Sequence, residues 1–450
     1  MKRTFKQLTG AIVVALSLGV SVEIGTAQVF QVYDPGFAKD LVDVSSPETI
    51  APGTKITAQN WQKYKGFMPL GLQKLYSGQY FWHIGNEPDF TVTVGPTIHT
   101  PLPKKYVEDT EKYHGQVNLR QLPDGAYVMD GYVAGMPFPH PTEPNLAYKV
   151  AYNIRTRYGP WAMHIHYRSV NIDQYHSVTS GDGLEDAWRM GHISDPGMPL
   201  AQPYAGDIFY SNRNFEVAPE QVKYLTEITL LHDDPAQIQE IYLFLPTLRR
   251  SLRLSGAARC SPLLGTDWIQ DDQGDILFLK LTDFRFKLLG EKKLLAMVHQ
   301  DPVARNYPDE SFTSYQSSLP GWPKPVDGNW ELRDMYVIEI KALPQHYCVP
   351  TRVIYVDKET FIPFLHDIYD PNNKLWKTYF FLQGVVPINP QEKAYLHDAF
   401  NDSIYDLQNK HMSLAQVAMP GVSANQYTPE ATRTQESTQA FPASLAQVMQ

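Results

Sequence analysis

The sequence predicts a mainly β protein of the α+β class, built on a large antiparallel sheet that closes or half closes into a barrel. From Trp161 onward, segments with alternating apolar and polar residues follow one another, and most are separated by turn sequences such as Asp-Asp-Pro, Asp-Gln-Gly and Pro-Asn-Asn. Successive strands joined by short turns pair antiparallel. A chain of 450 residues with 43% hydrophobic content can bury a large core, so disorder is not expected.

The first 27 residues have the layout of a secretory signal peptide. Lys2, Arg3 and Lys6 form a basic start, residues 11–22 are apolar, and residues 25–27 form a small-residue cleavage site. The apolar run is too short to anchor the chain in a bilayer, and no Cys follows the cleavage site to carry a lipid. We therefore expect residues 1–27 to be cleaved near Ala27 and the mature protein to be exported.

Residues 28–160 are predicted to form a loop-rich N-terminal lobe with short helices. Polar capping residues and prolines delimit the helical patterns. We expect helices around residues 61–75, 104–113 and 145–158, and a pair of strands within residues 78–97.

Residues 161–411 are predicted to form an antiparallel half-barrel, and residues 412–450 a flexible C-terminal tail. The tail is rich in Ser, Thr, Gln, Ala and Pro, which is typical of segments without a packed core, and it has at most a short docking helix. The predicted strands lie within residues 161–172, 223–233, 240–256, 275–290, 291–301, 330–343, 349–370 and 373–389.

Three arginines stand together in residues 245–256, "LPTLRRSLRLSG", of an otherwise acidic chain. Because strand side chains alternate, Arg249 and Arg253 fall on one face, while Arg250 shares the other with leucines. Pro246 argues against a helix there. Two interpretations remain open: a solvated face paired with acidic neighbours, or an anion contact at the rim of a groove. With a net charge of −9, nucleic acid is not expected as a partner.

Several predicted strands are apolar on both faces, which indicates that both faces are covered. One face can pack on helices, and the other can line a cavity for an apolar ligand. Whether this concave face is open or filled by the protein's own side chains is left open by the sequence. The candidate ligand-binding residues of the groove are Phe284, Phe286, Tyr336, Ile338, Ile340, Trp376 and Phe380.

The chain has two cysteines, Cys260 and Cys348. An even number in an exported protein indicates a disulfide bond, and two free buried thiols are the alternative. Both lie next to predicted strands, so a bridge within one sheet is feasible if their Cα atoms are less than about 7 Å apart.

The search for catalytic and metal-binding motifs gives little. The sequence has no G-x-S-x-G, G-x-G-x-x-G, P-loop or H-E-x-x-H motif, so we expect neither an enzyme nor a cofactor. His164 and His166 share a strand face, with His176 in the next loop, but such a pair is more often found on a surface than at a metal. The acidic sequence around Asp271 and Asp272 lacks calcium-loop spacing and predicts a solvated turn.

Several blocks resemble the bacterial domain-of-unknown-function family 1329, whose proteins are often described as outer-membrane lipoprotein-sorting-like. These blocks include "GTDWIQDDQGDILFLKLTDFRFKLLGEKKLLA", "WELRDMYVIEIKAL" and "GYVAGMPFP". The segment "YVDKETFIPFLHDIYDPNNKLWK" is also similar to the LolA/LolB carrier fold, with Asn372-Asn373 in place of the usual Gly. The resemblance implies a half-open antiparallel barrel of the LolA/LolB type with a helical lid, located in the periplasm. Relatives look like partners of efflux-type inner-membrane transporters and outer-membrane proteins.

The leading functional expectation is a periplasmic binding or carrier protein for a lipid or other hydrophobic ligand, associated with envelope transport. The alternative is a periplasmic adaptor of an efflux-type transporter complex, without ligand transfer. If the concave face of the candidate groove is filled by the protein's own side chains, the carrier expectation fails and the adaptor becomes the better one.

Overall fold

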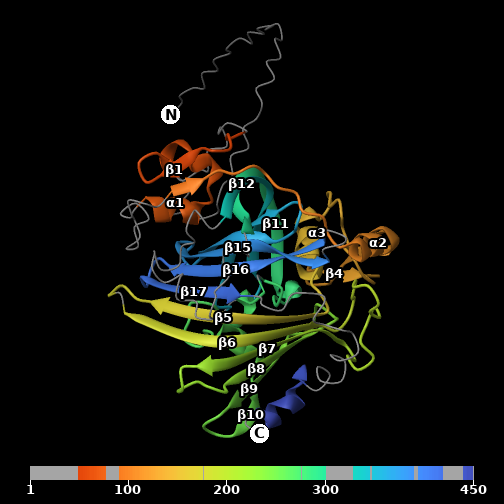
Figure 1. Cartoon of the computed structure of the whole chain (residues 1–450). Helices are drawn as coiled ribbons and strands as arrows, with labels where there is room; N and C mark the ends of the chain where they lie inside the picture. Colours follow the sequence, from red (N-terminus) through yellow and green to blue (C-terminus); the bar gives the residue numbers. More distant parts are fainter. Residues whose placement is uncertain are drawn as a thin grey trace, which may run out of the picture.

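The computed structural model describes residues 49–77, 91–175, 177–274, 276–300, 328–344, 347–389, 394–418 and 439–448. In these residues thirteen strands form one antiparallel sheet, in the order β11-β12-β13-β14-β15-β16-β17-β5-β6-β7-β8-β9-β10 (Figure 1). The strands are β5 (Ala162–Ile172), β6 (Val178–Arg189), β7 (Ile208–Ala218), β8 (Thr226–His232), β9 (Glu240–Leu245), β10 (Arg250–Arg253), β11 (Phe284–Gln300), β12 (Gly328–Ala342), β13 (Thr351–Asp357), β14 (Pro363–Tyr369), β15 (Leu375–Asn389), β16 (Ala394–Asp406) and β17 (His411–Ala418).

One end of this sheet curls back on itself. Besides its antiparallel pairing with β12, strand β11 meets β15 in parallel at Gln300 and Gly384. Strands β11 to β15 therefore form a ring, while the strands from β16 to β10 continue as an open sheet (Figure 1). The prediction of a mainly β protein with one large antiparallel sheet is confirmed.

The predicted helices are present in the N-terminal lobe. The segment around residues 61–75 forms η1 (Trp61–Lys63), η2 (Lys65–Phe67) and α1 (Leu70–Tyr76). The other two helices are α2 (Lys104–Tyr113), followed by η4 (His114–Gln116), and α3 (Leu146–Thr156). Two small hairpins accompany them, β1 (Lys55–Thr57) with β2 (Thr91–Thr93), and β3 (Asn118–Gln121) with β4 (Tyr127–Asp130). Most of the strand pair predicted within residues 78–97 lies outside the described residues.

Helix α1 covers one side of the ring and approaches it very closely. The backbone N–H of Gly71 donates to Asp367 Oδ1 on β14 at 2.9 Å. A Cβ atom at Gly71 would lie 1.9 Å from Thr378 Oγ1 on β15, so only glycine allows this contact. Leu70, Leu72 and Leu75 of the helix belong to the same buried cluster as the inward side chains of β14 and β15.

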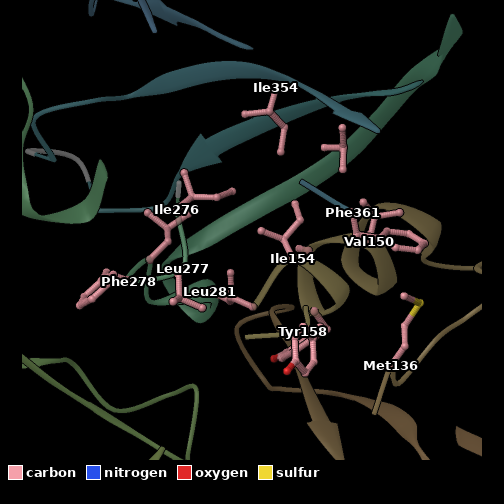
Figure 2. Packing of buried hydrophobic residues seen from close by; sticks show 14 of the residues in the cluster. Met136, Val150, Ile154, Tyr158, Ile276, Leu277, Phe278, Leu281, Ile354 and Phe361 are labelled. Atoms are coloured by element: carbon pink, nitrogen blue, oxygen red, sulfur yellow. The ribbon is translucent and has the colours of Figure 1, made fainter. Parts of the chain in front are cut away.

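Helix α3 covers the other side of the ring and fills the predicted groove. Figure 2 shows Ile154 of α3 pointing towards Leu277 and Leu281, which belong to the same buried cluster. Phe286 on β11 makes an edge contact with Tyr148 of α3, with ring centroids 5.3 Å apart. The concave face is therefore occupied by the protein's own side chains at these strands.

Two predicted strands are divided differently in the structure. Residues 240–256 form β9, a turn and β10, because Arg249 adopts a left-handed φ of 50° that ends one strand and starts the next. In the segment predicted as 275–290, a turn and η7 (Leu281–Asp283) come first, and β11 begins only at Phe284. Strand β11 then runs on to Gln300 through a bulge between Leu288 and Gly290.

The boundary predicted at residue 412 is corrected by the structure. Residues His411–Ala418 form β17, which pairs with β16 on one side and β5 on the other and so lies inside the sheet. A Ser- and Gln-containing segment without strong alternation becomes a strand here because both neighbours supply hydrogen bonds. The predicted short docking helix corresponds to η11 (Pro442–Gln447), whose Leu445 is buried against the outer face of β6 to β9 (Figure 1).

Within the described residues, no helix is long and apolar enough to cross a membrane. The predicted signal peptide lies outside the described residues.

Candidate functional site

The open half of the sheet holds a cavity of about 430 Å³. Its floor is the face of β5 to β9 that also carries Tyr210 and Leu231, and its roof is the segment of residues 254–274, called the strap below. The strap runs from the end of β10 towards β11 and includes η5 (Gly256–Cys260) and η6 (Gln270–Asp272). The floor residues are Tyr167, Ser169, Glu185, Asn214, Glu216, Glu227 and Leu243, and the roof includes Leu254, Ala258, Pro262, Leu263, Leu264 and Trp268.

A disulfide bond fixes the strap to the body of the protein. Cys260 in the strap is bonded to Cys348, with their Cα atoms 5.8 Å apart, and the predicted disulfide is confirmed. The bridge closes a loop between residues 88 positions apart in the chain. The bridge joins the strap to the loop that precedes β13 and so fixes the position of the strap relative to the sheet.

Buried ion pairs hold the strap at two further points. Arg259 donates to Asp271 Oδ2 at 2.8 Å and to Asp283 Oδ2 at 2.6 Å. Arg352 on β13 donates to Asp272 Oδ1 at 2.7 Å. Breaking a buried pair from one side typically costs about 3–5 kcal/mol, so these contacts strongly favour one position of the strap. The prediction of a solvated turn at Asp271 and Asp272 was wrong, because both carboxylates are buried by these partners.

The roof and one wall of the cavity are apolar. Leu243 of β9 and Leu254 and Leu263 of the strap line the cavity, and the backbone N–H of Leu254 donates to Ile241 of β9 at 2.8 Å. Trp268 packs edge-on against Tyr379 of β15, with ring centroids 6.2 Å apart. An apolar ligand body would find its contacts on this side.

The floor carries carboxyl groups on three adjacent strands. In the cross-strand register Glu185 of β6 lies opposite Asn214 of β7, and Asn214 opposite Glu227 of β8, with Glu216 two residues further along β7. Gln270 of the strap donates to Glu227 Oε2 at 2.6 Å, and Tyr167 donates to Glu216. Burial raises the pKa of Glu216 to about 7 and also raises the pKa of Glu227. Among the described residues that line this cavity, none is Lys, Arg or His.

A smaller chamber of about 100 Å³ adjoins this cavity. Glu185, Gly274 and Asp402 line both spaces. The remaining walls of the small chamber mix apolar residues, Met163, Ile165, Tyr210, Leu277, Phe278, Phe381 and Leu396 among them, with the basic residues Arg157, Arg189 and His397.

A third cavity, of about 520 Å³, lies against α3 and is strongly polar. Arg155 and His192 line it, and His192 Nε2 lies 2.5 Å from Asp233 Oδ1. Burial lowers the pKa of Arg155. This space lacks the combination of an apolar wall and a polar floor that distinguishes the cavity under the strap.

The seven predicted groove residues do not line any of these three cavities. Five of them, on β11 and β12, are buried in the cluster beneath α3, and Phe380 is buried against Phe364 on the α1 side. Trp376 is half-buried, and its Nε1 donates to Asp406 at 2.8 Å. These positions are parts of the core rather than an open surface. The residues concerned are Phe284, Phe286, Tyr336, Ile338, Ile340, Trp376 and Phe380.

The three arginines lie on the hairpin of β9 and β10 and are exposed. Arg253 pairs with Glu240 at 2.8 Å on the face opposite the cavity floor, and Arg249 lies in the turn. Arg250 shares the face of Leu243, but it is not among the cavity-lining residues. Of the two interpretations, the structure agrees with the solvated face paired with an acidic neighbour.

The candidate metal ligands His164 and His166 lie on the face of β5 opposite the cavity floor. His164 contacts Asp186, which also pairs with Arg213 at 2.7 Å. In the part of the chain that the structure describes, no group of three or more His, Cys, Asp or Glu side chains is arranged to hold a metal ion. His176 lies outside the described residues.

Sequence reasoning missed Glu185 and Glu216 because it missed β6 and β7, and it did not single out Glu227 on the predicted strand within residues 223–233. Once "VTSGDGLEDAWR" and "IFYSNRNFEVA" are recognised as strands, alternation together with their antiparallel register places Glu185 and Glu216 on one face. The sequence therefore did contain a pattern for these two strands, but the side chains that alternate in it are largely polar.

Comparisons with known proteins give a family and a set of distant folds. A family model described as "Protein of unknown function (DUF1329)" matches residues 55–442. No curated protein matches the chain. Among solved structures, a DUF1329 family protein from Desulfovibrio piger is 13% identical, with a TM-score of 0.43, covering 65% of this chain and 99% of the other.

Two further solved structures are similar at the same level. A putative outer membrane lipoprotein-sorting protein domain from Vibrio parahaemolyticus is 13% identical, with a TM-score of 0.42, covering 64% of this chain and 98% of that one. A LolA superfamily protein from Nitrosomonas europaea is 12% identical, with a TM-score of 0.36, covering 60% and 90%. At these identities and TM-scores, the likeness is a distant one of fold.

Proposed function

This chain belongs to the DUF1329 family, whose function is unknown, so the family assigns no activity to it. From the cavity itself, we propose that the protein binds and carries a hydrophobic or amphipathic ligand. The observation that carries this proposal is the cavity of about 430 Å³ under the strap, with an apolar roof and a polar floor. Ligand sites for small molecules are typically concave, about 300–1,000 Å³ in volume, and mostly apolar with a few polar groups.

Transfer of the apolar body from water supplies the affinity. Each buried methylene contributes about 0.8 kcal/mol, so an alkyl or ring system held between Leu243 and Leu263 gains several such increments. The polar floor then fixes the orientation of the ligand. Binding needs no cofactor, and we propose a carrier rather than an enzyme.

We infer that the protein acts in the periplasm, in envelope transport. Its predicted signal peptide and its disulfide bond both suit an exported protein in an oxidising compartment. A lipid or another hydrophobic small molecule is then the ligand.

The adaptor is the second candidate, and one observation favours it. The groove expected on β11, β12 and β15 is filled by the protein's own core, so those strands offer no ligand site. Exposed leucines on the hairpin and the strap, Leu248, Leu252 and Leu264, would suit contact with a protein of an efflux-type transporter or of the outer membrane.

A matched pair of variants tests the carrier proposal. Leu243→Asp places a carboxylate in the apolar part of the cavity, and it should weaken binding of the neutral fluorescent probe N-phenyl-1-naphthylamine about tenfold or more, because a charge there is costly. Leu248→Asp, on the exposed turn of the same hairpin, is the control and should bind like the parent protein. Fluorescence titration measures both, and circular dichroism checks the fold.

Equal probe binding by both variants would contradict the carrier proposal at this cavity. Native mass spectrometry of protein purified from its own host separates the two candidates. A co-purified lipid or amphipathic molecule supports the carrier, whereas a stoichiometric protein partner with an empty cavity supports the adaptor.

A further inference from the structure

We propose that the cavity under the strap selects amphipathic ligands whose head is a positively charged amine, held by Glu216 with Glu185 and Glu227 nearby. This inference rests on the proposed function and specifies its ligand class. It reverses the sign of the head group expected from the arginine-rich hairpin, which is exposed and away from the cavity lining.

The charge of the cavity wall is the first support. Five carboxyl side chains line the cavity, and no described lining residue is basic. One of the five, Asp272, is neutralised by Arg352 at 2.7 Å. The three floor glutamates stand on adjacent strands and face the same side, and neighbouring strands are about 4.8 Å apart. One ammonium group can therefore come within reach of more than one carboxylate.

Glu216 is the second, independent support. Its side chain lines the cavity although only 2% of the residue is exposed. One carboxylate oxygen accepts a hydrogen bond from Tyr167, and the other accepts none from the residues that the structure describes. No described cation forms an ion pair with it. A buried carboxylate without a cation is unfavourable, and an entering ammonium group would supply the missing partner.

The groups around Glu216 add no positive charge to the cavity. Tyr167 faces it from β5, Asp182 and Glu185 come from β6, and Glu227 comes from β8. The charge of Asp182 is taken up by Arg168 through two hydrogen bonds of 2.5 and 2.9 Å. Burial raises the pKa of Glu216 to about 7, with Asp182 and Glu227 contributing in the same direction. A cation beside Glu216 would offset both the burial of its carboxylate and the repulsion from Asp182 and Glu227.

Glu227 has a supporting role because it is already hydrogen-bonded. Gln270 and Gln273 of the strap donate to its two oxygens at 2.6 and 3.3 Å. These contacts hold the strap over the acidic floor. An ammonium group bound at Glu216 would therefore lie between the floor and the apolar residues of the strap. The tail of the ligand then extends towards Leu243, Leu254 and Leu263.

Three probes with one tail and different heads test the inference: decylamine, decanol and decanoate. Each displaces N-phenyl-1-naphthylamine from the intact, disulfide-bonded protein at pH 8 and low salt. We expect decylamine to bind about tenfold or more tightly than decanoate, which is the scale of one charge-assisted contact. In Glu216→Gln this preference should fall about tenfold, while the affinity for decanol stays within about twofold.

The matched control is Glu240→Gln, which removes a carboxylate on the opposite face that pairs with Arg253. It should keep the full preference for the amine. Circular dichroism and the thermal midpoint report whether each variant is folded, and Glu216→Asp serves as a second variant that retains the charge.

The outcomes distinguish this inference from the proposed function. Binding of all three probes with equal affinity, or tightest binding of decanoate, overturns the amine preference and leaves the carrier proposal intact. A preference for decylamine that survives in Glu216→Gln overturns the role of Glu216. Displacement by none of the three probes rejects the carrier proposal and this inference together.

Discussion

Three buried carboxyl groups of this protein differ in their hydrogen-bond partners, and these partners decide whether the pKa of each group is lowered or raised. Burial alone would raise the pKa of Asp357, but Arg333 donates to both of its oxygens and the pKa falls below its usual value. Asp367 is equally buried, but the hydrogen bonds that it accepts come from neutral groups, Tyr355 and Gly71 among them, so burial raises its pKa to about 7. Glu216 resembles Asp367, except that its carboxyl group borders a cavity that a ligand can enter.

At the residue scale, decylamine binding should therefore depend on pH through Glu216. The pKa of its carboxyl group is raised by burial to about 7, so the free protein holds a proton there below pH 7. The ammonium group needs the ionised form, while an alkyl amine stays charged well above pH 8. Affinity should rise by up to about tenfold per pH unit below pH 7 and level off by pH 8.

Displacement titrations at pH 6, 7 and 8 measure this dependence. The Glu216→Gln variant should give a flat profile, and decanol should give a flat profile with the parent protein. A slope that is the same in the parent and in Glu216→Gln would assign the proton to another group.

At the element scale, the strap acts as a fixed roof rather than a mobile loop. Its position depends on the Cys260–Cys348 bridge and on the ion pairs Arg259–Asp283 and Arg352–Asp272, all of which connect it to the ring end of the sheet. The cavity floor belongs to the open end of the same sheet. The strap therefore joins the two parts of the sheet across the site.

Loss of the disulfide should loosen this roof. In Cys348→Ser we expect the free energy of unfolding to fall by about 2–5 kcal/mol, as for other long loops closed by a disulfide. We also expect faster dissociation of N-phenyl-1-naphthylamine, because the roof is held by fewer contacts. Stopped-flow dilution measures the rate, and thermal unfolding measures the stability. An unchanged dissociation rate in a destabilised protein would show that the strap does not cover the ligand.

A strand could be predicted from the sequence when its own side chains are strongly apolar. It could not be predicted when it is a strand mainly because of its neighbours in the sheet. Strands β12 to β15 have strong apolar patterns and were predicted, since their side chains are buried on both faces. Strands β6, β7, β16 and β17 contain Gly, Ser, Asn and Asp and were not. They are strands because a neighbour lies on each side, and that arrangement arises only in the assembled sheet.

The site followed the same division. The disulfide could be predicted from the number of cysteines and the export signal, because only two partners exist. The acidic floor could not, because Glu216 lies on β7, which was not predicted. The apolar residues of β11 and β12 correctly indicated that both faces are covered. One face is covered by the chain's own helix α3 and the other lies in the buried cluster that includes α1, and the sequence left that open.

At the scale of the whole molecule, we expect the residues of β17 to be needed for folding and the residues after residue 418 to contribute much less to stability. A protein that ends at residue 410 lacks β17, which leaves one side of β16 and one side of β5 unpaired in the middle of the sheet. We expect it to aggregate and to show no cooperative unfolding, since unpaired buried backbone groups are costly.

A protein that ends at residue 418 is the matched comparison. Among the described residues, it keeps every strand of the sheet and loses the cover that Ala440 and Leu445 provide on the outer face. It should remain folded and monomeric, with a lower thermal midpoint. Size-exclusion chromatography and thermal unfolding compare the two proteins. Similar behaviour of both truncated proteins would contradict the central position of β17.

The curling of the sheet has a consequence for how copies of this protein meet. A flat sheet has two outer strands, and each is a template on which another chain can add its own backbone. Here β11 meets β15 at one residue pair, Gln300 and Gly384, and the outermost strand at the other end of the large sheet is β10. That strand is four residues long and begins and ends with arginine. Two copies that approach along it bring like charges together, so we expect the arginines to oppose backbone pairing of copies along this strand.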